Sequence, residues 1–511
     1  MVKEQDTDNA KRLGNQGGSE CPAKANKIGH STPYSYCSER LSPFGGLLGL
    51  VKFMELIQFK EIFAGLYTPP TRTPDMGHYT MVCGFIMLLF IGFNRVWHFL
   101  YIQTDSMLCS IFQVVKLPFV TTYWRYVDSL GINQGKSLLE VMSALRERVW
   151  HICEIEYRRI HIDIDTTVET IYGKQQGGRK GHNTKNRGKK GFRPVLCFIE
   201  ETREYFAGKL RVGETMGGEE VGEVIRGFKK YLPGCVKEVT LRGDGEFISW
   251  ESVEAAEEEG YQYIFGNKGC NPPLDPLKWY KIRESDKVEY NECIYQPMGW
   301  KRACRFVVMR IPEDKPTEGK AVQGKLFEGE KYTYREFVTS MTGKAHKVIE
   351  EYDKRADSEN LIGEAKREGL AAIVSNKFMT NYAYFQIVML SYNIWRSFKM
   401  LAGHSQLLEQ QQQQQQAEGS KVETQCAARE VIDNTIRIAR LKLLFIAAKI
   451  TGHANTYEVK YSEHDSRVSG LFRFMRYLDE RLQQARPWLD GRRWLPKHLS
   501  VLGIKQVAFS Q

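Results

Sequence analysis

Long hydrophobic runs, a secretory leader and paired cysteines are all missing from this chain. The most apolar stretch, MVCGFIMLLFIGF at 81–93, has thirteen residues, fewer than the roughly 18–20 that span a bilayer, so it predicts a buried core helix. The polar N-terminus, MVKEQDTDNAKRLGNQGG, is no signal peptide. The eleven cysteines include no C-x-x-C pair, which argues against a zinc ribbon and favours a reducing compartment. These absences predict a cytoplasmic protein with no membrane contact.

A strong charge imbalance is also lacking. Lys and Arg outnumber Asp and Glu by 72 to 61 in 511 residues, a formal charge of +11. This modest excess is compatible with a nucleic-acid partner but does not require one. The length predicts two to four domains, and no solenoid-type repeat is visible.

Composition and hydrophobic periodicity divide the chain into successive regions. The segment 157–272 reads as three strands, a helix, a strand, a helix and a strand, which predicts a mixed α/β sheet with helices on its faces. The predicted regions are a disordered tail at 1–40, a helical region at 41–153, an α/β core at 154–272 and 341–403, a β-rich insertion at 273–340, a polar glutamine-rich linker at 404–425, and a helical region at 426–511.

Two carboxylates are predicted at strand ends. In HIDIDTT, side chains alternate across a strand, so Ile162 and Ile164 face a core while His161, Asp163 and Asp165 face the other way. An acid beside an apolar strand is costly unless it is paired or holds a metal. Asp163 and Asp165 could instead pair with the basic neighbours Arg158 and Arg159.

A second acid, Asp244, follows VTLRG at the end of another apolar strand. The Gly-Asp-Gly turn allows close approach of a ligand to the backbone, and the ends of strands in an open α/β sheet are where sites form. Asp244 could also be an ordinary turn residue.

A polar stripe is predicted on a later helix, in YDKRADSENLIGEAK at 352–366. Tyr352, Arg355, Glu359 and Lys366 sit at helical offsets of 0, 3, 7 and 14, which place them within an arc of about 60° over about four turns. The alternative is a solvated face with charge pairs, as most charged stripes are.

Two strand-end acids and a helix glutamate together offer hard oxygen ligands. Such ligands suit Mg²⁺ or Mn²⁺ rather than zinc. Two such ions about 3.5–4 Å apart can activate a water or hydroxyl and stabilise the leaving oxygen of a phosphodiester. The three acids therefore predict metal-dependent phosphodiester chemistry.

The motifs DIDTT, LRGDGEF and Y-x2-R-x3-E-x6-K, in this order, resemble those of the DDE transposases of bacterial insertion sequences, in the branch that carries the YREK signature. The resemblance covers about residues 155–400, and IDIDTTVETIYGKQQG and NYAYFQIVMLSYNIW also look like flanking segments of that group. It implies a ribonuclease-H-like α/β core with a β-rich insertion, flanked by N-terminal and C-terminal helical regions.

The resemblance also implies Asp165, Asp244 and Glu359 as the catalytic, metal-binding residues, with two Mg²⁺ or Mn²⁺ ions. Asp165 is preferred to Asp163 because the acid of the family directly precedes the Thr pair. The middle motif departs from the family, where R-A-D-S-G-F or a similar sequence is expected, and Glu246 could compete as a ligand.

Double-stranded DNA is the expected partner. The segment 174–193 holds eight Lys or Arg, five glycines and no acid, as a phosphate-binding loop would; the alternative is a solvated hairpin tip. Its candidate DNA contacts are Lys185, Arg187, Lys189 and Lys190. Trp279 and Trp300 lie near basic residues and are more often core residues, but the resemblance makes one of them a candidate for holding an extruded base, and we take Trp300.

The predicted activity is cut-and-paste transposition at the ends of the element's own insertion sequence. A water would hydrolyse one strand, and the freed 3′-OH would attack a second phosphodiester and later target DNA. The resemblance implies a homodimer that holds two terminal inverted repeats. We expect the region 41–153 to bind DNA ends, 426–511 to contact DNA or dimerise, and Tyr352, Arg355 and Lys366 to hold the DNA strand. The alternatives are a non-transposing metal-dependent nuclease of the same fold and a non-catalytic DNA-binding protein.

Overall fold

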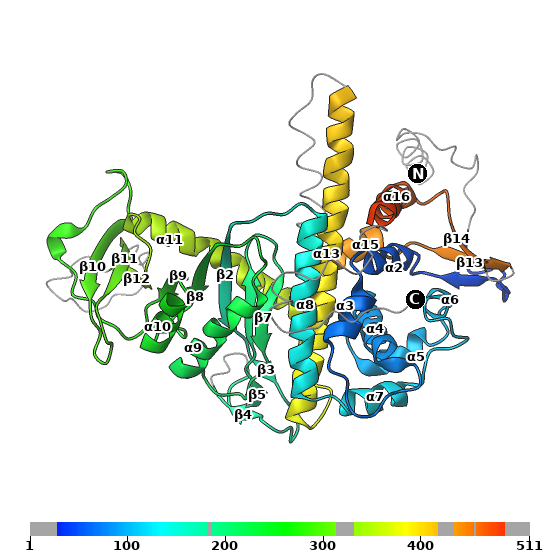
Figure 1. Cartoon of the computed structure of the whole chain (residues 1–511), viewed down its shortest axis with the longest axis horizontal. Helices are drawn as coiled ribbons and strands as arrows, with labels where there is room; N and C mark the ends of the chain where they lie inside the picture. The colour runs from blue at the N-terminus through cyan, green and yellow to red at the C-terminus, as the bar shows by residue number, and fades with distance from the viewer. Residues whose placement is uncertain (1–27, 182–185, 313–331, 417–433, 454–455, 486–511) are drawn as a thin grey trace, which may run out of the picture.

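The protein divides into an α/β half and a helical half, with the long helix α13 (Phe378–Gln416) between them (Figure 1). The computed structural model describes residues 28–181, 186–312, 332–416, 434–453 and 456–485. The first 27 residues of the predicted tail at 1–40, and residues 486–511 of the predicted helical region at 426–511, lie outside these ranges.

A central mixed sheet forms the α/β half. Its strand β2 pairs parallel with β8 and antiparallel with β6, β6 pairs antiparallel with β7, and β8 pairs parallel with β9. The predicted order of strands and helices between 157 and 272 is confirmed for the central sheet, but three short strands that were not predicted lie between residues 169 and 192. The central strands are β2 (Arg159–Thr166), β6 (Val195–Ile199), β7 (Tyr205–Lys209), β8 (Glu238–Gly243) and β9 (Gln262–Gly266).

The predicted β-rich insertion extends this sheet. Three strands, β10 (Glu289–Tyr295), β11 (Cys304–Pro312) and β12 (Tyr332–Thr339), form an antiparallel meander. Strand β12 pairs antiparallel with β9, so that Val338 lies opposite Phe265. The sheet thus has eight strands in the order β10-β11-β12-β9-β8-β2-β6-β7.

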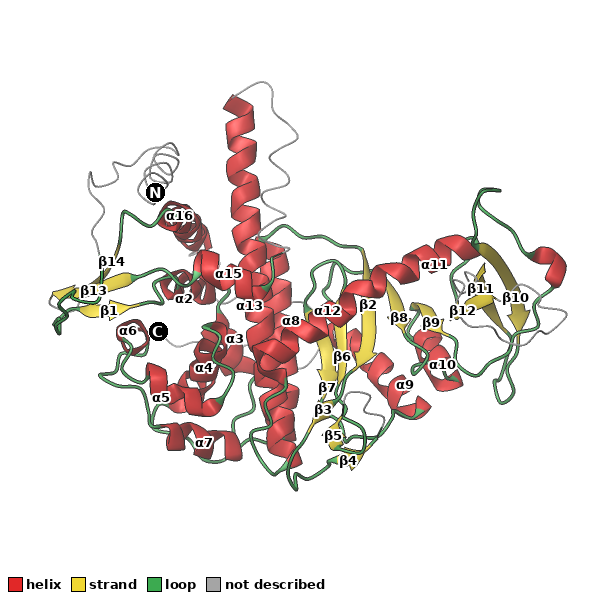
Figure 2. Ribbon diagram, turned by 180° about the vertical axis from the view of Figure 1, so that it is seen from behind, coloured by secondary structure: helices red, strands yellow, loops and turns green. Residues whose placement is uncertain are grey.

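Helices cover both faces of the sheet (Figures 1 and 2). On one face, α9 (Gly218–Arg226) and α10 (Trp250–Glu258) pack their apolar residues against Ile160, Ile162 and Ile164 of β2. On the other face, α11 (Ala345–Asp353) packs against β9, β11 and β12. After a 3-10 turn, η5 (Lys354–Ala356), the chain continues into α12 (Asp357–Ala365) and the π-helical turn η6 (Lys366–Leu370).

The helical half joins segments from both ends of the chain. Helices α4 (Gly77–Phe90), α8 (Ile132–Ile152) and α13 share one apolar core, and α8 and α13 lie side by side (Figures 1 and 2). Its other helices are α2 (Leu47–Leu56), α3 (Phe59–Leu66), α5 (Phe99–Ile102), α6 (Ser106–Ile111), α7 (Val120–Asp128), α15 (Ile436–Leu443) and α16 (Arg467–Ala485).

The helical prediction for 426–511 is wrong in part. Strands β13 (Ala448–His453) and β14 (Thr456–Tyr461) form a hairpin, and β1 (Arg40–Ser42) pairs with β13 in a three-stranded sheet. The pairing of β1 with β13 joins segments far apart in the chain, so local hydrophobic periodicity did not indicate these strands.

The linker prediction for 404–425 is also wrong at its beginning. Helix α13 continues through residue 416, because glutamine is a good helix former and extends an existing helix at little cost. Residues 417–433 lie outside the described residues. The apolar run 81–93 falls largely in α4, whose residues 81–90 are buried, which confirms the core-helix prediction. Within the ranges that the structure describes, no helix is both long and apolar enough to cross a bilayer.

Candidate active site

Strand β2 presents a polar face to the helices α11 and α12. As predicted from alternation, Ile162 and Ile164 are fully buried in the apolar core, while His161, Asp163 and Asp165 carry ion pairs on the other face. The strand therefore places three ionisable side chains in a row, two residues apart.

Asp163 has a structural partner that differs from those considered in the sequence. Arg242 of β8 donates to Asp163 from Nε at 2.6 Å and from Nη2 at 2.9 Å, and the two residues lie opposite each other in the parallel register. Pairing of Asp163 with Arg158 or Arg159 is not observed; Arg159 pairs with Glu238 instead. A buried bidentate pair occupies both oxygens of Asp163, which favours Asp165 as the strand's metal ligand.

Asp165 is buried among other charges. Its Oδ1 accepts the backbone N–H of Thr166 at 2.8 Å, and its Oδ2 lies 3.0 Å from Nη2 of Arg355. Burial raises the pKa of Asp165 to about 6; the Arg355 guanidinium opposes this rise, while the charges of Asp244 and Glu359 add to it. The three predicted acids are therefore close enough to interact electrostatically.

Asp244 follows β8 in a tight turn, as predicted. Its Oδ1 accepts the backbone N–H of Glu246 at 3.0 Å, and its backbone carbonyl accepts the N–H of Phe247. A Cβ on Gly245 would lie 2.8 Å from the Cβ of Lys268, so the turn has no room for a side chain there. Asp244 thus stabilises the turn, and the negative charge of its carboxylate also helps to raise the pKa of Asp165.

Glu246 is a fourth acid next to this group. Its Oε2 accepts the Thr166 hydroxyl at 2.8 Å and pairs with Arg193, whereas its buried Oε1 has no hydrogen-bond partner. A buried oxygen without a donor is costly, so the position of Glu246 supports the expectation that it could act as a ligand.

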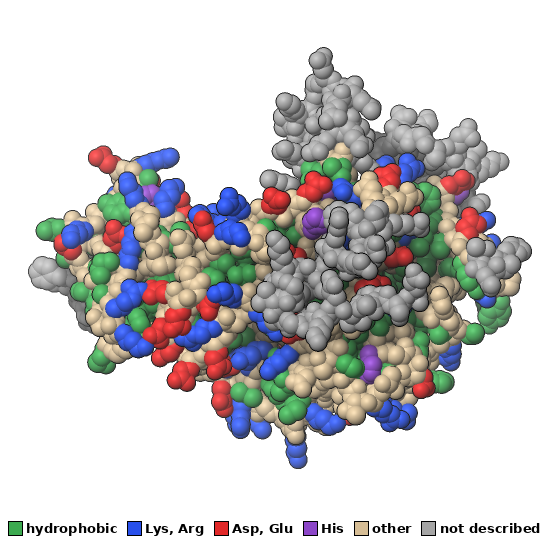
Figure 3. All heavy atoms as spheres, in the orientation of Figure 1, with side chains coloured by type: hydrophobic (Ala, Val, Ile, Leu, Met, Phe, Trp, Pro, Cys, Tyr) green, Lys and Arg blue, Asp and Glu red, His purple; other side chains and the backbone are tan. Residues whose placement is uncertain are grey.

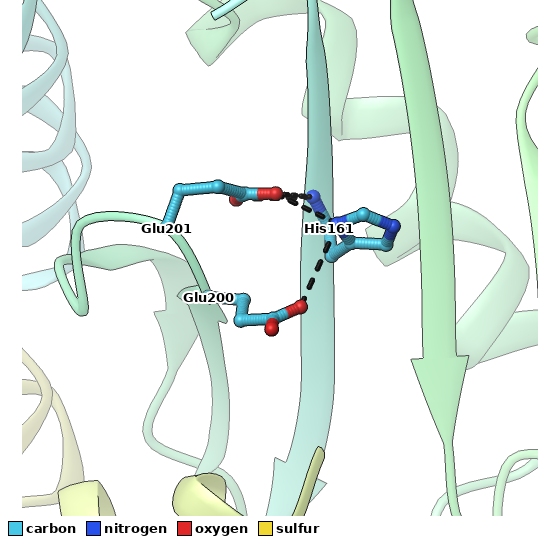
Figure 4. A group of neighbouring side chains, drawn as sticks. All are labelled: His161, Glu200 and Glu201. Atoms are coloured by element: carbon cyan, nitrogen blue, oxygen red, sulfur yellow. Dashed lines mark hydrogen bonds and ion pairs between the residues drawn. The ribbon is translucent and has the colours of Figure 1, made fainter. Parts of the chain in front are cut away.

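The acids fit a divalent cation by their chemistry. All donors are carboxylate oxygens, and Asp165 is already repelled by Asp244 and Glu359, a field that a hard cation such as Mg²⁺ or Mn²⁺ would relieve. Asp165, Asp244 and Glu359 are not drawn together as tightly as a preformed cage. Of the residues that the structure describes, only His161, Glu200 and Glu201 bring three donor atoms within 4.8 Å of one another (Figure 4).

The polar stripe is not on one continuous α-helix. The 3-10 turn η5 lies between Tyr352 and Glu359, and Lys366 begins the π-helical turn. Such irregular turns change the angle between successive side chains, so the ideal-helix geometry behind the predicted arc does not apply across the whole segment. The helical prediction itself is confirmed.

The stripe side chains contact the protein instead of forming a solvated face. The ring of Tyr352 lies 4.4 Å from that of Phe337, centroid to centroid. Arg355 also donates to the backbone carbonyl of Ile164 at 3.2 Å. These contacts are evidence against the solvated alternative for Tyr352 and Arg355.

Lys366 and Glu359 complete the stripe. Lys366 lies 3.2 Å from Oε1 of buried Glu169 and donates to the carbonyl of Val168, so it binds the segment that follows β2. Glu359 is exposed in the first turn of α12, where a carboxylate can be reached by a ligand.

The basic segment 174–193 contains two strands of a small three-stranded sheet, β4 (Arg179–Lys180) and β5 (Lys190–Phe192). The third strand, β3 (Glu169–Thr170), precedes the segment and pairs with β5. Arg187, Lys189 and Lys190 are exposed, and Figure 3 shows Lys and Arg side chains along this edge of the molecule. Lys185 lies outside the described residues. A basic surface thus directly follows the active-site strand in the chain.

Trp300 and Trp279 are both half-buried. Trp300 packs against Trp250 and Phe306, with ring centroids 5.9 and 6.3 Å apart. The ring of Trp279 lies under the guanidinium of Arg310 at 4.0 Å. Each ring has intramolecular contacts, as a core residue does, and part of each remains accessible.

Arg242, Glu200, Glu201 and Ser358 were not identified from the sequence. Ser358 donates to Asp165 at 3.4 Å. A signal was present for Arg242: its position, between Leu241 and the Gly-Asp-Gly turn, puts it on the polar face of an apolar strand. Identification of its partner needed the register between β2 and β8.

Comparisons with known proteins address the family of the chain. The family model described as "Transposase DDE domain group 1" matches residues 36–417. Among solved structures, one match is a cryo-EM structure of the piggyBac transposase synaptic complex with hairpin DNA, at 12% identity and a TM-score of 0.38, covering 77% of this chain and 85% of that chain. No curated protein sequence matches.

Proposed function

Because the chain belongs to the family of transposases described as DDE domain group 1, we propose that it moves its own insertion sequence by cut-and-paste transposition. In this proposal Asp165, Asp244 and Glu359 hold two Mg²⁺ or Mn²⁺ ions. The observation that carries it is the buried Asp165, whose pKa is raised by burial and by the charges of the other two acids. In the proposal, these three carboxylates, from β2, the turn after β8, and α12, share one site on the central mixed sheet.

The metal ions, when bound, would polarise the phosphodiester and activate the attacking hydroxyl. The protein's own groups would position the DNA. Arg355, which neutralises Asp165 in the DNA-free protein, can grip a phosphate with its planar guanidinium, Lys366 as a point charge and Tyr352 through its hydroxyl. The partial burial of Tyr352 and Arg355 restricts their rotamers, which favours a fixed grip on the strand next to the acids.

The remaining regions would bind DNA away from the reaction. We assign phosphate contacts to Arg187, Lys189 and Lys190 with Lys185, and the holding of an extruded base to Trp300. The helical region 41–153 would bind the terminal inverted repeats, and the region 426–511 would contact DNA or support a homodimer. Target DNA would enter after the two ends are held together.

The proposal is tested by charge-removing variants of the acids. Asp165→Asn, Asp244→Asn and Glu359→Gln keep the side-chain shapes and should each abolish cleavage of DNA that carries the element's ends, while binding to those ends persists. The matched control is Asp357→Asn, which changes an exposed carboxylate on the same helix that pairs with Arg203 and should leave cleavage unchanged.

The products distinguish the alternative functions. A transposase joins the freed 3′-OH to a second DNA, which a gel resolves as a strand-transfer product. Cleavage without any joined product would identify a metal-dependent nuclease, and binding without cleavage by the unaltered protein would identify a non-catalytic DNA-binding protein. Near-normal cleavage by one acid variant would remove that residue from the site.

A further inference from the structure

A second polar cluster lies on β2, on the side of Asp163 away from Asp165. His161 projects from the strand toward Glu200 and Glu201, which follow β6 in the turn to β7 (Figure 4). One ligand atom from each of the three residues lies within 4.8 Å of the other two. The function proposed above does not use this cluster.

The hydrogen-bond geometry calls for one positive charge in the cluster, carried by a proton on the imidazole or by a bound ion. Nδ1 of His161 lies 2.7 Å from Oε1 of Glu201 and 3.5 Å from Oε2 of Glu200, while Nε2 lies 2.9 Å from Oε1 of Glu351. A neutral imidazole has one N–H. If Nε2 donates to Glu351, the lone pair on Nδ1 faces two carboxylate oxygens, and this contact is repulsive unless a positive charge lies between them.

A proton can fill that position for only one carboxylate, whereas a metal ion can bind all three groups. The arrangement Glu351···H–Nε2 also matches the carboxylate–histidine pair that orients a metal-binding imidazole and fixes its tautomer. The side chains of His161, Glu200 and Glu201 are 15%, 27% and 17% exposed, so an ion from solvent can reach them.

The charge balance points the same way. Around His161, the carboxylates of Asp163, Glu200, Glu201 and Glu351 face the permanent cations Arg242 and Lys354. Two negative charges are left for His161 or a bound ion to balance; a protonated imidazole balances one of them, and a divalent ion balances both. Burial raises the pKa of Glu200; Arg242 and His161 oppose this rise, and Glu201 and Asp163 add to it.

We propose that His161 Nδ1, Glu200 and Glu201 bind a divalent transition metal such as Zn²⁺, at a site separate from the catalytic acids. One imidazole and two carboxylates suit Zn²⁺ better than Mg²⁺, which prefers oxygen ligands alone. The ion would fasten the β6–β7 turn to β2 and, through Glu351, to α11. Its role is structural, because it holds the helical segment that leads to Glu359.

The site is tested in the full chain with the catalytic acids removed. In the Asp165→Asn, Asp244→Asn double variant, titration with Zn²⁺ by calorimetry and with Co²⁺ by visible absorption should still show binding of one ion per chain at this site. Addition of Glu201→Gln, which keeps an acceptor for the His161 backbone N–H, should weaken it at least 100-fold. Glu351→Gln should weaken it about 10–100-fold, because it acts only through the ring.

The controls separate this site from other metal binders. Nine described cysteines are free thiols, which can also bind Zn²⁺. Binding at these thiols should not change in the Glu201→Gln variant. Glu219→Gln removes an exposed carboxylate on α9 and should leave the affinity unchanged. His161→Gln should abolish the ion's imidazole-dependent absorption; if that variant does not fold, the Glu201→Gln result decides.

Two results would overturn the proposal. The first is the absence of bound metal in the double variant. The second is binding that neither Glu201→Gln nor His161→Gln changes. In either case the cation between His161 and Glu201 is a proton, and the cluster is an imidazolium bridge.

Discussion

Asp165→Asn should stabilise the metal-free protein at neutral pH. Burial and the neighbouring acids raise the pKa of Asp165 from 3.8 to about 6, so the folded protein holds a proton that the unfolded chain releases at lower pH. Between these pH values the folded state binds more protons than the unfolded state, and the free energy of unfolding falls as pH rises. Asparagine resembles the protonated acid in shape and charge and does not titrate.

The size of the effect follows from the pKa shift. Each pKa unit corresponds to about 1.36 kcal/mol, so a shift of about two units gives about 3 kcal/mol. The variant and the unaltered protein should have similar stability near pH 4. The variant should become more stable by up to about 3 kcal/mol as pH rises through 6, and the change should level off about one pH unit higher.

The assay is urea unfolding followed by circular dichroism, in EDTA, at half-unit steps from pH 4 to 7.5. Mn²⁺ should then restore stability to the unaltered protein at pH 7, because the ion favours the ionised carboxylate, and should restore little to the variant. If the stability difference does not change with pH, the Asp165 carboxylate is ionised without cost in the folded protein, and the reasoning that places three interacting acids there is refuted.

The other predictions concern the positive groups around these acids. Arg355→Ala should strengthen Mn²⁺ binding in calorimetry at pH 8, where Asp165 is ionised, because the guanidinium competes with the ion for Oδ2 of Asp165, and Arg355→Lys should keep part of that competition. Equal affinities in all three proteins would contradict this. Lys366→Met should lower the free energy of unfolding by about 1–3 kcal/mol in urea titrations, since it removes the ion pair with buried Glu169; unchanged stability would show that the pair contributes nothing. Alanine at Arg187, Lys189 and Lys190 should weaken binding to any DNA duplex and flatten the slope of log K against log salt by about 0.9 per lost contact. An unchanged slope would exclude these residues as phosphate contacts.

The order of strands and helices in the α/β core could be predicted from local patterns. Alternation in HIDIDTT fixed which residues of β2 enter the core, and the Gly-Asp-Gly turn marked the end of β8. The same alternation placed Asp163 and Asp165 on one face, and it could not choose between them. The choice needed Arg242, whose position opposite Asp163 depends on the register of two strands about 80 residues apart in the chain.

Long-range contacts account for the remaining differences. Strand β12 joins the central sheet through β9, and β1 joins a hairpin more than 400 residues away; neither pairing has a local signal. The stripe on 352–366 was predicted from an ideal helix, but the chain forms a 3-10 turn where Arg355 contacts Asp165. The glutamine tract was read as a linker by composition, although its helix propensity allows α13 to continue.

The polar side chains of β2 and of its neighbour β8 explain how the segment before Glu359, the proposed metal ligand on α12, is held in place. Three contacts cross from the sheet to the segment before Glu359: His161 to Glu351, Arg242 to the Glu351 carbonyl at 2.8 Å, and Asp165 to Arg355. The first and last of these contacts start from β2, and Arg242 lies on β8 opposite Asp163, midway between them, so the contacts advance along the sheet by about 6.6 Å at each step. Apolar packing of α11 ends at Tyr352 and resumes in α12 at Leu361 and Ile362, so these polar contacts hold the segment between them. Because Asp165 is both the last of these contacts and a proposed metal ligand, metal binding and the position of Glu359 must be coupled: an ion that takes Asp165 competes with Arg355 and releases the guanidinium beside the site where the DNA phosphate would lie.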